Sequence, residues 1–360
     1  MKILDIFASK KSSLELGVDI GTTAIKLVEV ERTSGSQPKL LNYGMLETQS
    51  ALLRANTALQ TSTLKIFERD IAEYLKALIA QVKPRAKTAV ASLPSFSAFT
   101  TIITIPEVDQ KDLEQAVIYQ ARQVIPSAIN EVALDWSKVG EHTDANGNKF
   151  FQIFLVSVPQ EQIKKYQRIF GEAGLTLRAL EVESVSLMRS LVANDPTPSY
   201  VVDIGSLSTG ILVAEGGQLR FSGQTDFSGS SLTQALATSL NINPLRAEEL
   251  KRERGIIGTG ANYELSTIML PFLDAIISEI RRAEFSYKTQ FPDARNIERM
   301  ILAGGGSNLL GIEKYFRDQF KMPIVKATPL SKFSYPVNLE PLAPELNSYL
   351  SVALGLALKE

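Results

Sequence analysis

The chain contains no cysteine, and its 360 residues include only one histidine and one tryptophan. The absence of cysteine excludes disulfide bonds, thiolate nucleophiles and metal sites built on sulfur ligands. The single histidine, His142, lies in the polar stretch EHTDANGNK, which predicts a hairpin loop. We therefore expect neither a histidine-based metal site nor a histidine-based catalytic triad.

A strong net charge and long hydrophobic runs are missing as well. The 38 Lys and Arg residues balance the 39 Asp and Glu residues and leave a net charge of −1, so no overall field would attract nucleic acid or an anionic membrane. No apolar run approaches the roughly 18 residues that a membrane-spanning helix needs. Asp5 interrupts the short apolar start MKILDIF, so we interpret residues 1–14 as an N-terminal tail and not as a secretory signal.

The first structural pattern is LGVDIGTTAIKLVEV at residues 16–30, in which two runs of strand-forming residues flank the turn residues Gly21, Thr22 and Thr23. A third strand is predicted at 38–47, and a helix at 64–82 from the spacing of its apolar residues. A short buried strand, TAVASLP, follows at 88–94. We assign residues 15–95 to a first domain with the order βββαβ.

Residues 96–182 break this order and predict a separate α+β subdomain inserted into the first domain. A strand at 99–106 precedes a helix at 109–125, which is opened by Asp109 and stopped by Pro126. Two strands, 131–140 and 149–159, and a helix at 160–174 complete the block. The segment LTLRALEVE then leads out of it.

The opening pattern returns from residue 200. The stretch SYVVDIGSLSTGILVAEGGQLRFSGQTDF again predicts three successive strands, and Asp203 occupies the position that Asp19 has in the first pattern, 184 residues earlier. A mainly helical stretch, at about 229–295, precedes a strand, a glycine turn and a helix that ends near residue 320. We assign residues 200–330 to a second domain.

The paired Asp-Ile-Gly turns indicate a ligand site between the two domains. Glycine lets the backbone approach a ligand, and adjacent N–H groups form a nest that binds anions. Hydroxyl side chains add donors, and a carboxylate can hold Mg²⁺ through water. A purely structural hairpin would explain either turn alone, whereas two copies at the head of two three-strand units favour a phosphate clamp.

A third element is LAGGGSNLLGIEKYF, in which three glycines lie between a buried strand and a helix. The glycines leave bare backbone where a flat ligand can lie. The alternative is a tight strand-to-helix turn, which rarely needs three glycines.

Together these motifs resemble the actin-like ATPase superfamily over nearly the whole chain. More closely, they are similar to the PilM family of type IV pilus assembly proteins, whose nearest relative is the cell-division protein FtsA. The resemblance implies an α/β fold of duplicated ribonuclease H-like βββαβα domains with an inserted α+β subdomain, as in FtsA and PilM. It also implies that residues 183–199 form a return helix of the first domain and that residues 331–360 return to that domain.

The resemblance further implies that ATP and Mg²⁺ bind in the interdomain cleft. The residues carried over as nucleotide-binding are Asp19, Gly21, Thr22, Thr23, Lys26, Asp203, Gly205, Thr209, Gly229, Glu248, Lys251, Gly304, Gly305, Gly306 and Asn308. Asp19 and Asp203 would hold Mg²⁺ through water. Two positions depart from the family pattern, since Ser230 follows Gly229 where a second glycine is common and Leu207 occupies a place where smaller residues are commoner.

ATP hydrolysis requires a group that orients water in line with the γ-phosphate. In the superfamily this group often comes from the helix before the second phosphate motif, which makes Glu183 in LEVESVSLMRSLV the candidate catalytic residue. The alternative is that Glu183 only stabilises the N-terminus of that helix, where acids are favoured. We expect ATP binding and, at most, slow hydrolysis.

By resemblance the protein is a scaffold at the cytoplasmic face of the inner membrane. It would bind the N-terminal cytoplasmic tail of PilN in a groove beside the inserted subdomain, and through PilN it would join the PilN/PilO complex. The candidate groove residues are Phe99, Ile102, Ile103 and Ile105, which alternatively form the core of the small sheet. No nucleic-acid partner is expected, because the basic stretches KPRAK and KRER carry no interleaved aromatic residues.

Two other functions remain open. An FtsA-like protein would self-associate into filaments with ATP. A small-molecule kinase of the same superfamily would need a catalytic base, and we find no carboxylate outside the phosphate turns that is placed as one.

Overall fold

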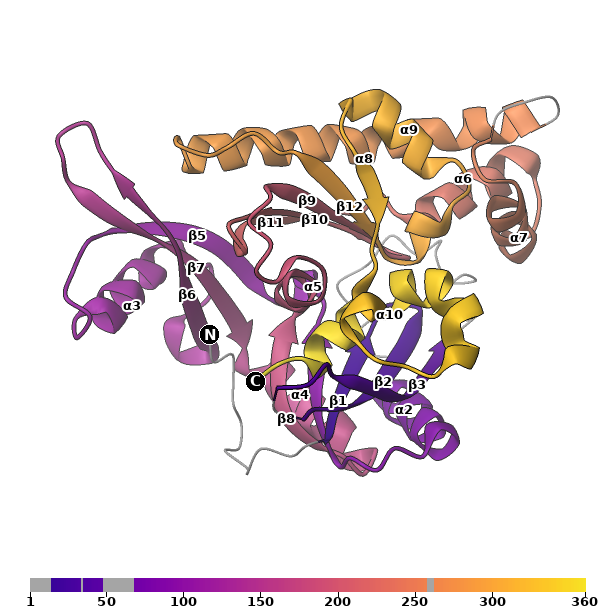
Figure 1. Cartoon of the computed structure of the whole chain (residues 1–360), viewed down its shortest axis with the longest axis horizontal. Coiled ribbons are helices and arrows are strands. Elements are labelled where there is room, and N and C mark those ends of the chain that lie inside the picture. The colour runs from indigo at the N-terminus through magenta and orange to yellow at the C-terminus, as the bar shows by residue number, and fades with distance from the viewer. Residues whose placement is uncertain (1–13, 34, 48–67, 258–261) are drawn as a thin grey trace.

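The computed structural model describes residues 14–33, 35–47, 68–257 and 262–360. The predicted tail, up to residue 13, and the start of the helix predicted at 64–82 lie outside these residues. Three β-sheets organise the described chain. Two sheets of five strands lie near one another, and a three-stranded sheet extends to the left in Figure 1.

The first sheet has the strand order β3-β2-β1-β4-β8. Its antiparallel part is β1 (Leu14–Ile20), β2 (Ala24–Glu31) and β3 (Lys39–Glu47), as the sequence predicts. β4 (Thr88–Leu93) lies parallel to β1, and β8 (Thr176–Val182) lies parallel to β4.

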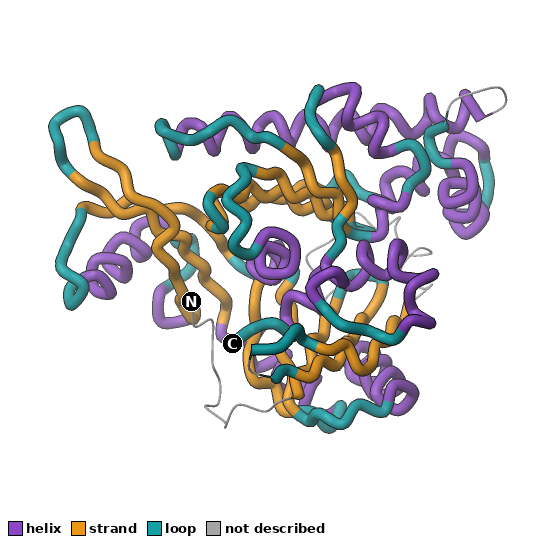
Figure 2. Tube along the Cα trace, in the orientation of Figure 1, coloured by secondary structure: helices purple, strands orange, loops and turns teal. Residues whose placement is uncertain are grey.

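Helices cover both faces of this sheet, as the tube in Figure 2 shows. α2 (Glu68–Val82) packs against α4 (Gln160–Glu172), and the core there contains Leu27. α10 (Ala343–Ala357) packs on the other face, where the core contains Val28. Because both faces are covered, the central strands β1 and β4 are buried along nearly their whole length, whereas the edge strand β3 is mostly only partly buried.

Strand β8 lies within the range 96–182 that the sequence predicts for the inserted subdomain, but it hydrogen-bonds to the first sheet. Its pairing with β4 runs from Thr176 opposite Thr88 to Val182 opposite Leu93. A parallel strand reaches its neighbour through a crossover connection, and the pattern LTLRALEVE alone does not show which sheet the strand joins.

The inserted sheet has the order β5-β7-β6, with β5 (Phe99–Pro106), β6 (Val132–Thr143) and β7 (Lys149–Pro159). α3 (Leu113–Val124) packs against it and buries Val117. The helix begins later than the predicted residue 109, because residues 109–112 form a turn in which the Asp112 N–H donates to the Asp109 carbonyl.

The second five-stranded sheet repeats the order of the first, as β11-β10-β9-β12-β13. Its strands are β9 (Ser199–Ile204), β10 (Thr209–Glu215), β11 (Gln218–Thr225), β12 (Arg299–Ala303) and β13 (Ile324–Lys326). Its helices are α6 (Gly229–Leu240), α7 (Pro244–Arg254), α8 (Asn262–Gln290) and α9 (Ile312–Phe320). The shared strand order confirms the internal repeat.

The chain crosses between the two sheets twice. It leaves β8 through α5 (Glu183–Leu187) and a π-helical turn, Met188–Val192, before β9 begins. It returns after β13 through the 3₁₀ helices η6 (Pro329–Lys332) and η7 (Val337–Leu342). Leu330 of η6 then shares a core with Val28 and with Leu350 of α10, which places the C-terminal segment on the first domain.

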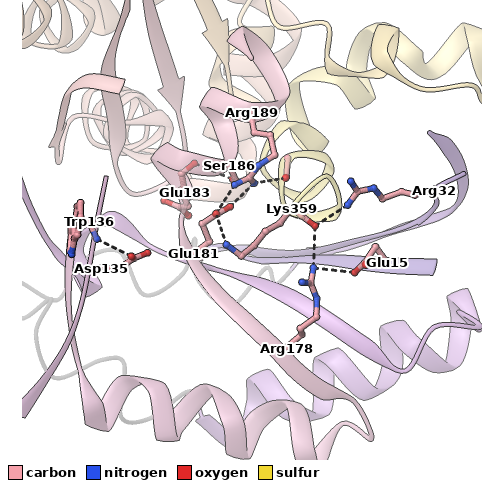
Figure 3. A network of polar contacts seen from close by, with 11 residues as sticks. Glu15, Arg32, Asp135, Trp136, Arg178, Glu181, Glu183, Ser186, Arg189 and Lys359 are labelled. Atoms are coloured by element: carbon pink, nitrogen blue, oxygen red, sulfur yellow. Dashed lines mark hydrogen bonds and ion pairs between the residues drawn. The ribbon is translucent and has the colours of Figure 1, made fainter. Parts of the chain in front are cut away.

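An ion-pair network fixes the end of the chain to the first sheet (Figure 3). The buried carboxylate of Glu181 accepts two hydrogen bonds of 2.6 Å from the Arg189 guanidinium, and Lys359 Nζ lies 3.4 Å away. Arg178 and Arg32 both donate to the Lys359 carbonyl. The last turn is thereby held against β8, β2 and the return helix.

Candidate functional site

The two Asp-Ile-Gly turns close in the same way. The Gly21 N–H donates to the Ala24 carbonyl at 3.0 Å, and the Gly205 N–H donates to the Ser208 carbonyl at 3.0 Å. Both turns therefore have the same hydrogen-bonded backbone, three residues apart, at the tip of a hairpin.

The aspartates that precede the two turns have different residues opposite them on the neighbouring strand. Asp19 is paired with Lys26 across the first hairpin, whereas Asp203 is paired with Gly210 across the second. The first hairpin thus supplies a cation that the second lacks.

Both turns line one cleft of about 370 Å³ between the two domains. The structure brings nearly all of the predicted site residues together there. The lining includes Asp19, Gly21, Thr22, Thr23, Lys26, Glu183, Asp203, Gly205, Gly229, Glu248, Lys251, Gly304, Gly305, Gly306 and Asn308.

Thr209 does not line this cleft. It is the first residue of β10, its side chain is fully buried, and its hydroxyl donates to the Phe227 carbonyl at 2.7 Å. Ser206 and Ser208 face the cleft in its place. The sequence offers several hydroxyl residues in this turn, and only the direction of each side chain distinguishes them.

Asp19 is held rigidly at the floor of the cleft. Its Oδ2 accepts a 2.8 Å hydrogen bond from Lys26 Nζ, and its Oδ1 accepts one of 2.8 Å from the Ser92 hydroxyl. Ser92 in turn accepts the Ile20 N–H at 3.1 Å, which fixes the orientation of the hydroxyl. Ser92, on β4, is a positioning residue that the sequence did not single out.

Three carboxylates of the cleft act on the Lys26 ammonium group. Burial lowers the pKa of Lys26, but the charges of Asp19, Asp203 and Glu183 outweigh it and the pKa is raised. Burial, with Asp19 close by, raises the pKa of Asp203 to about 6, although Lys26 opposes this shift. Burial and the charges of Asp19 and Asp203 raise the pKa of Glu183 well above its ordinary value. Asp203 and Glu183 therefore bind a proton at higher pH than ordinary carboxylic acids do, which is typical of functional sites.

Glu183 is the first residue of α5, so its position is also that of an acid favoured at a helix N-terminus. Its side chain lines the cleft with Asp19 and Asp203. Within the described residues, no three Asp, Glu or His side chains converge as direct ligands of a metal ion. Any cation among these carboxylates would therefore have to keep water ligands.

Glu248 and Lys251 form a hydrogen-bonded unit at the side of the cleft. Lys251 Nζ donates to Glu248 at 2.6 Å, to the Gly229 carbonyl at 2.9 Å and to the Thr233 hydroxyl at 2.9 Å. Burial lowers the pKa of Lys251 more strongly than the Glu248 charge raises it. The pair joins α7 to the N-terminus of α6.

The glycine turn after β12 packs too closely for side chains. Gly304 has φ +75°, and a Cβ there would lie 2.5 Å from Asp203 Oδ1. At Gly305 a Cβ would lie 2.8 Å from Cε1 of Tyr349. Tyr349, on α10, was not found from the sequence, because 43 residues separate it from this turn and only tertiary packing joins them.

Asn308 closes this turn with one unused donor. Its Oδ1 accepts a hydrogen bond of 3.2 Å from the Ser348 hydroxyl. Its Nδ2 is buried and forms no hydrogen bond of good geometry, although its interaction with the Tyr349 hydroxyl opposes the rise in the pKa of that group. A buried amide donor without a partner is costly, so this atom is suited to a ligand acceptor.

The four residues predicted to wall a partner groove all lie on β5. Ile103 and Ile105 are only 4% and 2% exposed and belong to the core beneath α3. Phe99 packs partly against that core, and Ile102 packs partly against the large core of the two domains. β5 is an edge strand of its sheet among the described strands.

None of the helices in the described ranges combines the length and the apolar composition that a membrane span needs.

Comparison with known proteins gives a family match over nearly the whole chain. The model of the family described as type IV pilus assembly protein PilM matches residues 17–360. A solved structure described as a PilM-PilN type IV pilus biogenesis complex is similar, with a TM-score of 0.79 and 26% identity. That match covers 97% of this chain and 98% of the other.

More distant structures share the fold. The ethanolamine utilization protein EutJ from Carboxydothermus hydrogenoformans is 16% identical with a TM-score of 0.56, covering 99% of this chain and 92% of the other. MreB5 of Spiroplasma citri bound to AMPPNP is 12% identical with a TM-score of 0.53, covering 96% and 95%.

Proposed function

The chain belongs to the PilM family of type IV pilus assembly proteins and has the actin-like fold. From this premise we propose that it is a scaffold. It would bind ATP with Mg²⁺ in its interdomain cleft and PilN beside its inserted subdomain. The observation that carries the proposal is the pair of equivalent turns, one from each domain, that line a single cleft. An interdomain cleft of this kind is a common location for a small-molecule ligand.

The phosphates are assigned to the two turns. Gly21 and Gly205 let the backbone approach, the Thr22 and Thr23 hydroxyls line the cleft, and Lys26 supplies the positive charge. Since a triphosphate would add negative charge beside three carboxylates, the cleft favours the nucleotide as its Mg²⁺ complex. Mg²⁺ would neutralise that charge, with Asp19 and Asp203 holding its water ligands.

The nucleoside is assigned to the glycine turn. Gly304, Gly305 and Gly306 line the cleft with backbone, because their missing side chains let the turn pack closely on Ile204 and Tyr349, and Nδ2 of Asn308 can donate to a ring system there. Glu248 retains acceptor capacity for a ribose hydroxyl, because a carboxylate has about four lone-pair sites. Lys251 then positions Glu248.

Hydrolysis is assigned to Glu183 at a slow rate. Its raised pKa favours the neutral acid in the free cleft, and a cation beside it would favour the carboxylate that can orient water. Its alternative role at the helix N-terminus explains its position equally well, so turnover of the Glu183 variant decides between the two roles.

PilN is the proposed partner because the similar complex contains PilN. A short tail, disordered until bound, would lie in a groove between the first domain and the inserted subdomain. Phe99 and Ile102 are both only partly buried, but they lie on opposite faces of β5, Phe99 beside Ile103 and Ile105 and Ile102 against the large core. A single groove can therefore use only one of them, and Phe99, at the start of β5, is the residue retained for this role. Binding to PilN would hold the protein at the cytoplasmic face of the inner membrane and beside the PilN/PilO complex.

The test is a titration of the full chain with an N-terminal PilN peptide, with and without AMPPNP and Mg²⁺. We expect saturable binding of the nucleotide only with Mg²⁺ and saturable binding of the peptide in at least one nucleotide state. Absence of peptide binding in both states would contradict the scaffold role. ATP-dependent pelleting without peptide binding would favour a filament-forming protein instead.

A further inference from the structure

A second pocket lies where the chain crosses between the two domains, and it shares no lining residue with the cleft. Its volume is about 130 Å³, roughly a third of the cleft. One wall is the π-helical turn of the first crossing, with Ser190 and Leu191, and the others are β12, β13 and η6 of the returning crossing. The pocket therefore contacts both crossing segments.

The lining is rich in positive charge. Three cationic side chains, Arg299, Lys326 and Lys332, accompany one carboxylate, Asp195. Arg299 forms an ion pair with Asp195 and also donates from Nε to the Ser199 hydroxyl at 2.8 Å. This pair is internally neutral, so the two lysines set the net charge of the pocket.

Lys332 is the cation without a counter-ion. Among the described residues no carboxylate lies within ion-pair distance of its Nζ, which donates to the Arg189 carbonyl at 3.2 Å. An ammonium group has three donors, so two remain for a ligand. Burial lowers the pKa of Lys332, and Asp195 only partly opposes this effect. Lys326 has only a half-exposed ion pair with Glu313, at 3.6 Å.

The backbone beside this pocket is strained. The Ala193 N–H donates to the Met188 carbonyl at 2.7 Å, the long-range bond of a π turn, and Ala193 has φ +49° without being glycine. π turns and such backbone outliers are concentrated at functional sites. Here they bring Ser190 to the wall of the pocket.

We propose that this pocket binds a small oxyanion of the phosphate class, with Lys332 and Lys326 as its charge-assisted donors and Arg299 as a supporting cation. Its size admits a phosphate group and excludes a nucleotide, and its charge favours a dianion over a single carboxylate. The phosphate group is either free inorganic phosphate or part of a small phosphomonoester. The site is distinct from the nucleotide cleft, so its occupancy does not depend on the function proposed for that cleft.

The experiment is calorimetric titration of the full chain with inorganic phosphate at constant ionic strength. We expect saturable binding that Lys332→Gln weakens at least about tenfold, because a charge-assisted donor is lost. Lys332→Arg should retain binding. Lys314→Gln, an exposed lysine on α9 that lines neither pocket, should leave the phosphate affinity unchanged. Lys26→Gln removes the cation proposed to contact phosphate in the cleft, and phosphate binding that depends on Lys332 should persist in it.

Three results would overturn the proposal. The first is no binding at tens of millimolar phosphate, and the second is a phosphate affinity of the Lys332→Gln protein equal to that of the wild type. The third is loss of phosphate binding in the Lys26→Gln protein, which would show that the anion binds in the cleft. If Lys332→Gln fails to fold, Lys326→Gln supplies the same comparison. Competition by glycerol phosphate would identify the ligand class as phosphomonoesters, and binding of inorganic phosphate alone would identify the free anion.

Discussion

Lys26 and Asp19 face each other across the first hairpin, with Lys26 Nζ 2.8 Å from Asp19 Oδ2. At the equivalent place in the second hairpin Asp203 faces Gly210, so the repeat does not supply a second cation. Lys26 is therefore the cation shared by Asp19, Asp203 and Glu183. This asymmetry leaves Lys26 as the cation beside the two turns, while Lys251 and Arg252 line the part of the cleft that contains Glu248.

Replacing Lys26 should accordingly weaken nucleotide binding. We expect Lys26→Met to reduce the affinity for Mg²⁺-AMPPNP at least about tenfold, because a buried charge-assisted contact is typically worth roughly 1.5–3 kcal/mol. Titration calorimetry measures the change, and Lys314→Met, an exposed lysine of the same charge, is the matched control. Equal affinity of the two variants would contradict the phosphate assignment.

The raised pKa of Asp203 predicts a pH dependence of stability. Because its pKa rises from an ordinary 3.8 to about 6 on folding, the folded protein binds more protons than the unfolded chain between these values. The contribution of Asp203 to the free energy of unfolding should therefore fall as the pH rises from about 4 to about 6, and the raised pKa of Glu183 adds a loss of the same sign. The full loss from Asp203 is on the order of 3 kcal/mol, since its pKa shifts by about two units and each unit corresponds to about 1.4 kcal/mol.

Denaturant unfolding of the wild type and Asp203→Asn at pH 4 and pH 7 checks this effect. The asparagine variant should lose less stability between the two pH values than the wild type. Identical losses would show that Asp203 has an ordinary pKa in the folded protein.

Glycine 305 provides a steric test of the nucleoside slot. A Cβ there would meet the Tyr349 ring at 2.8 Å, so Gly305→Ala should displace that ring, which lines the cleft, and weaken AMPPNP binding about tenfold or more. Gly171→Ala is the control, since a Cβ on that residue of α4 meets nothing within 4 Å. If both variants bind nucleotide like the wild type, the adenosine slot lies elsewhere.

Glu183 can be tested without disturbing nucleotide affinity. We expect Glu183→Gln to keep the dissociation constant for AMPPNP and to lower steady-state ATP turnover by roughly 10²-fold or more, as for other general bases. Phosphate-release kinetics measure the rate. Unchanged turnover in Glu183→Ala, together with loss of turnover in Asp19→Ala, would leave Glu183 only its role at the helix N-terminus.

The repeat and most of the cleft lining could be predicted from the sequence, because Asp-Ile-Gly turns and the three glycines are local signals. Three features could not. Thr209 points into the domain while Ser206 and Ser208 face the cleft, a matter of side-chain direction within one turn. Tyr349 reaches the glycine turn only through the docking of α10.

The third feature is the sheet that β8 joins. Its sequence reads as a strand, but pairing with β4 depends on where α4 returns the chain. The same limit applies to β5, where Ile103 and Ile105 could be groove or core by sequence and are core in the structure. Local patterns identify elements, whereas long-range packing decides their neighbours.

The C-terminal network offers a test of stability that leaves the cleft unchanged. Glu181 is fully buried and receives two 2.6 Å hydrogen bonds from Arg189, so Arg189→Met would leave a buried carboxylate with only Lys359, 3.4 Å away. Breaking one side of a buried pair typically costs about 3–5 kcal/mol. We expect a loss near the lower limit in denaturant unfolding, because Lys359 remains. The triple variant Glu181→Leu, Arg189→Met and Lys359→Met should recover part of this loss, because no charge of the network is then buried without a partner. A triple variant less stable than Arg189→Met would show that the network stabilises the fold beyond charge compensation.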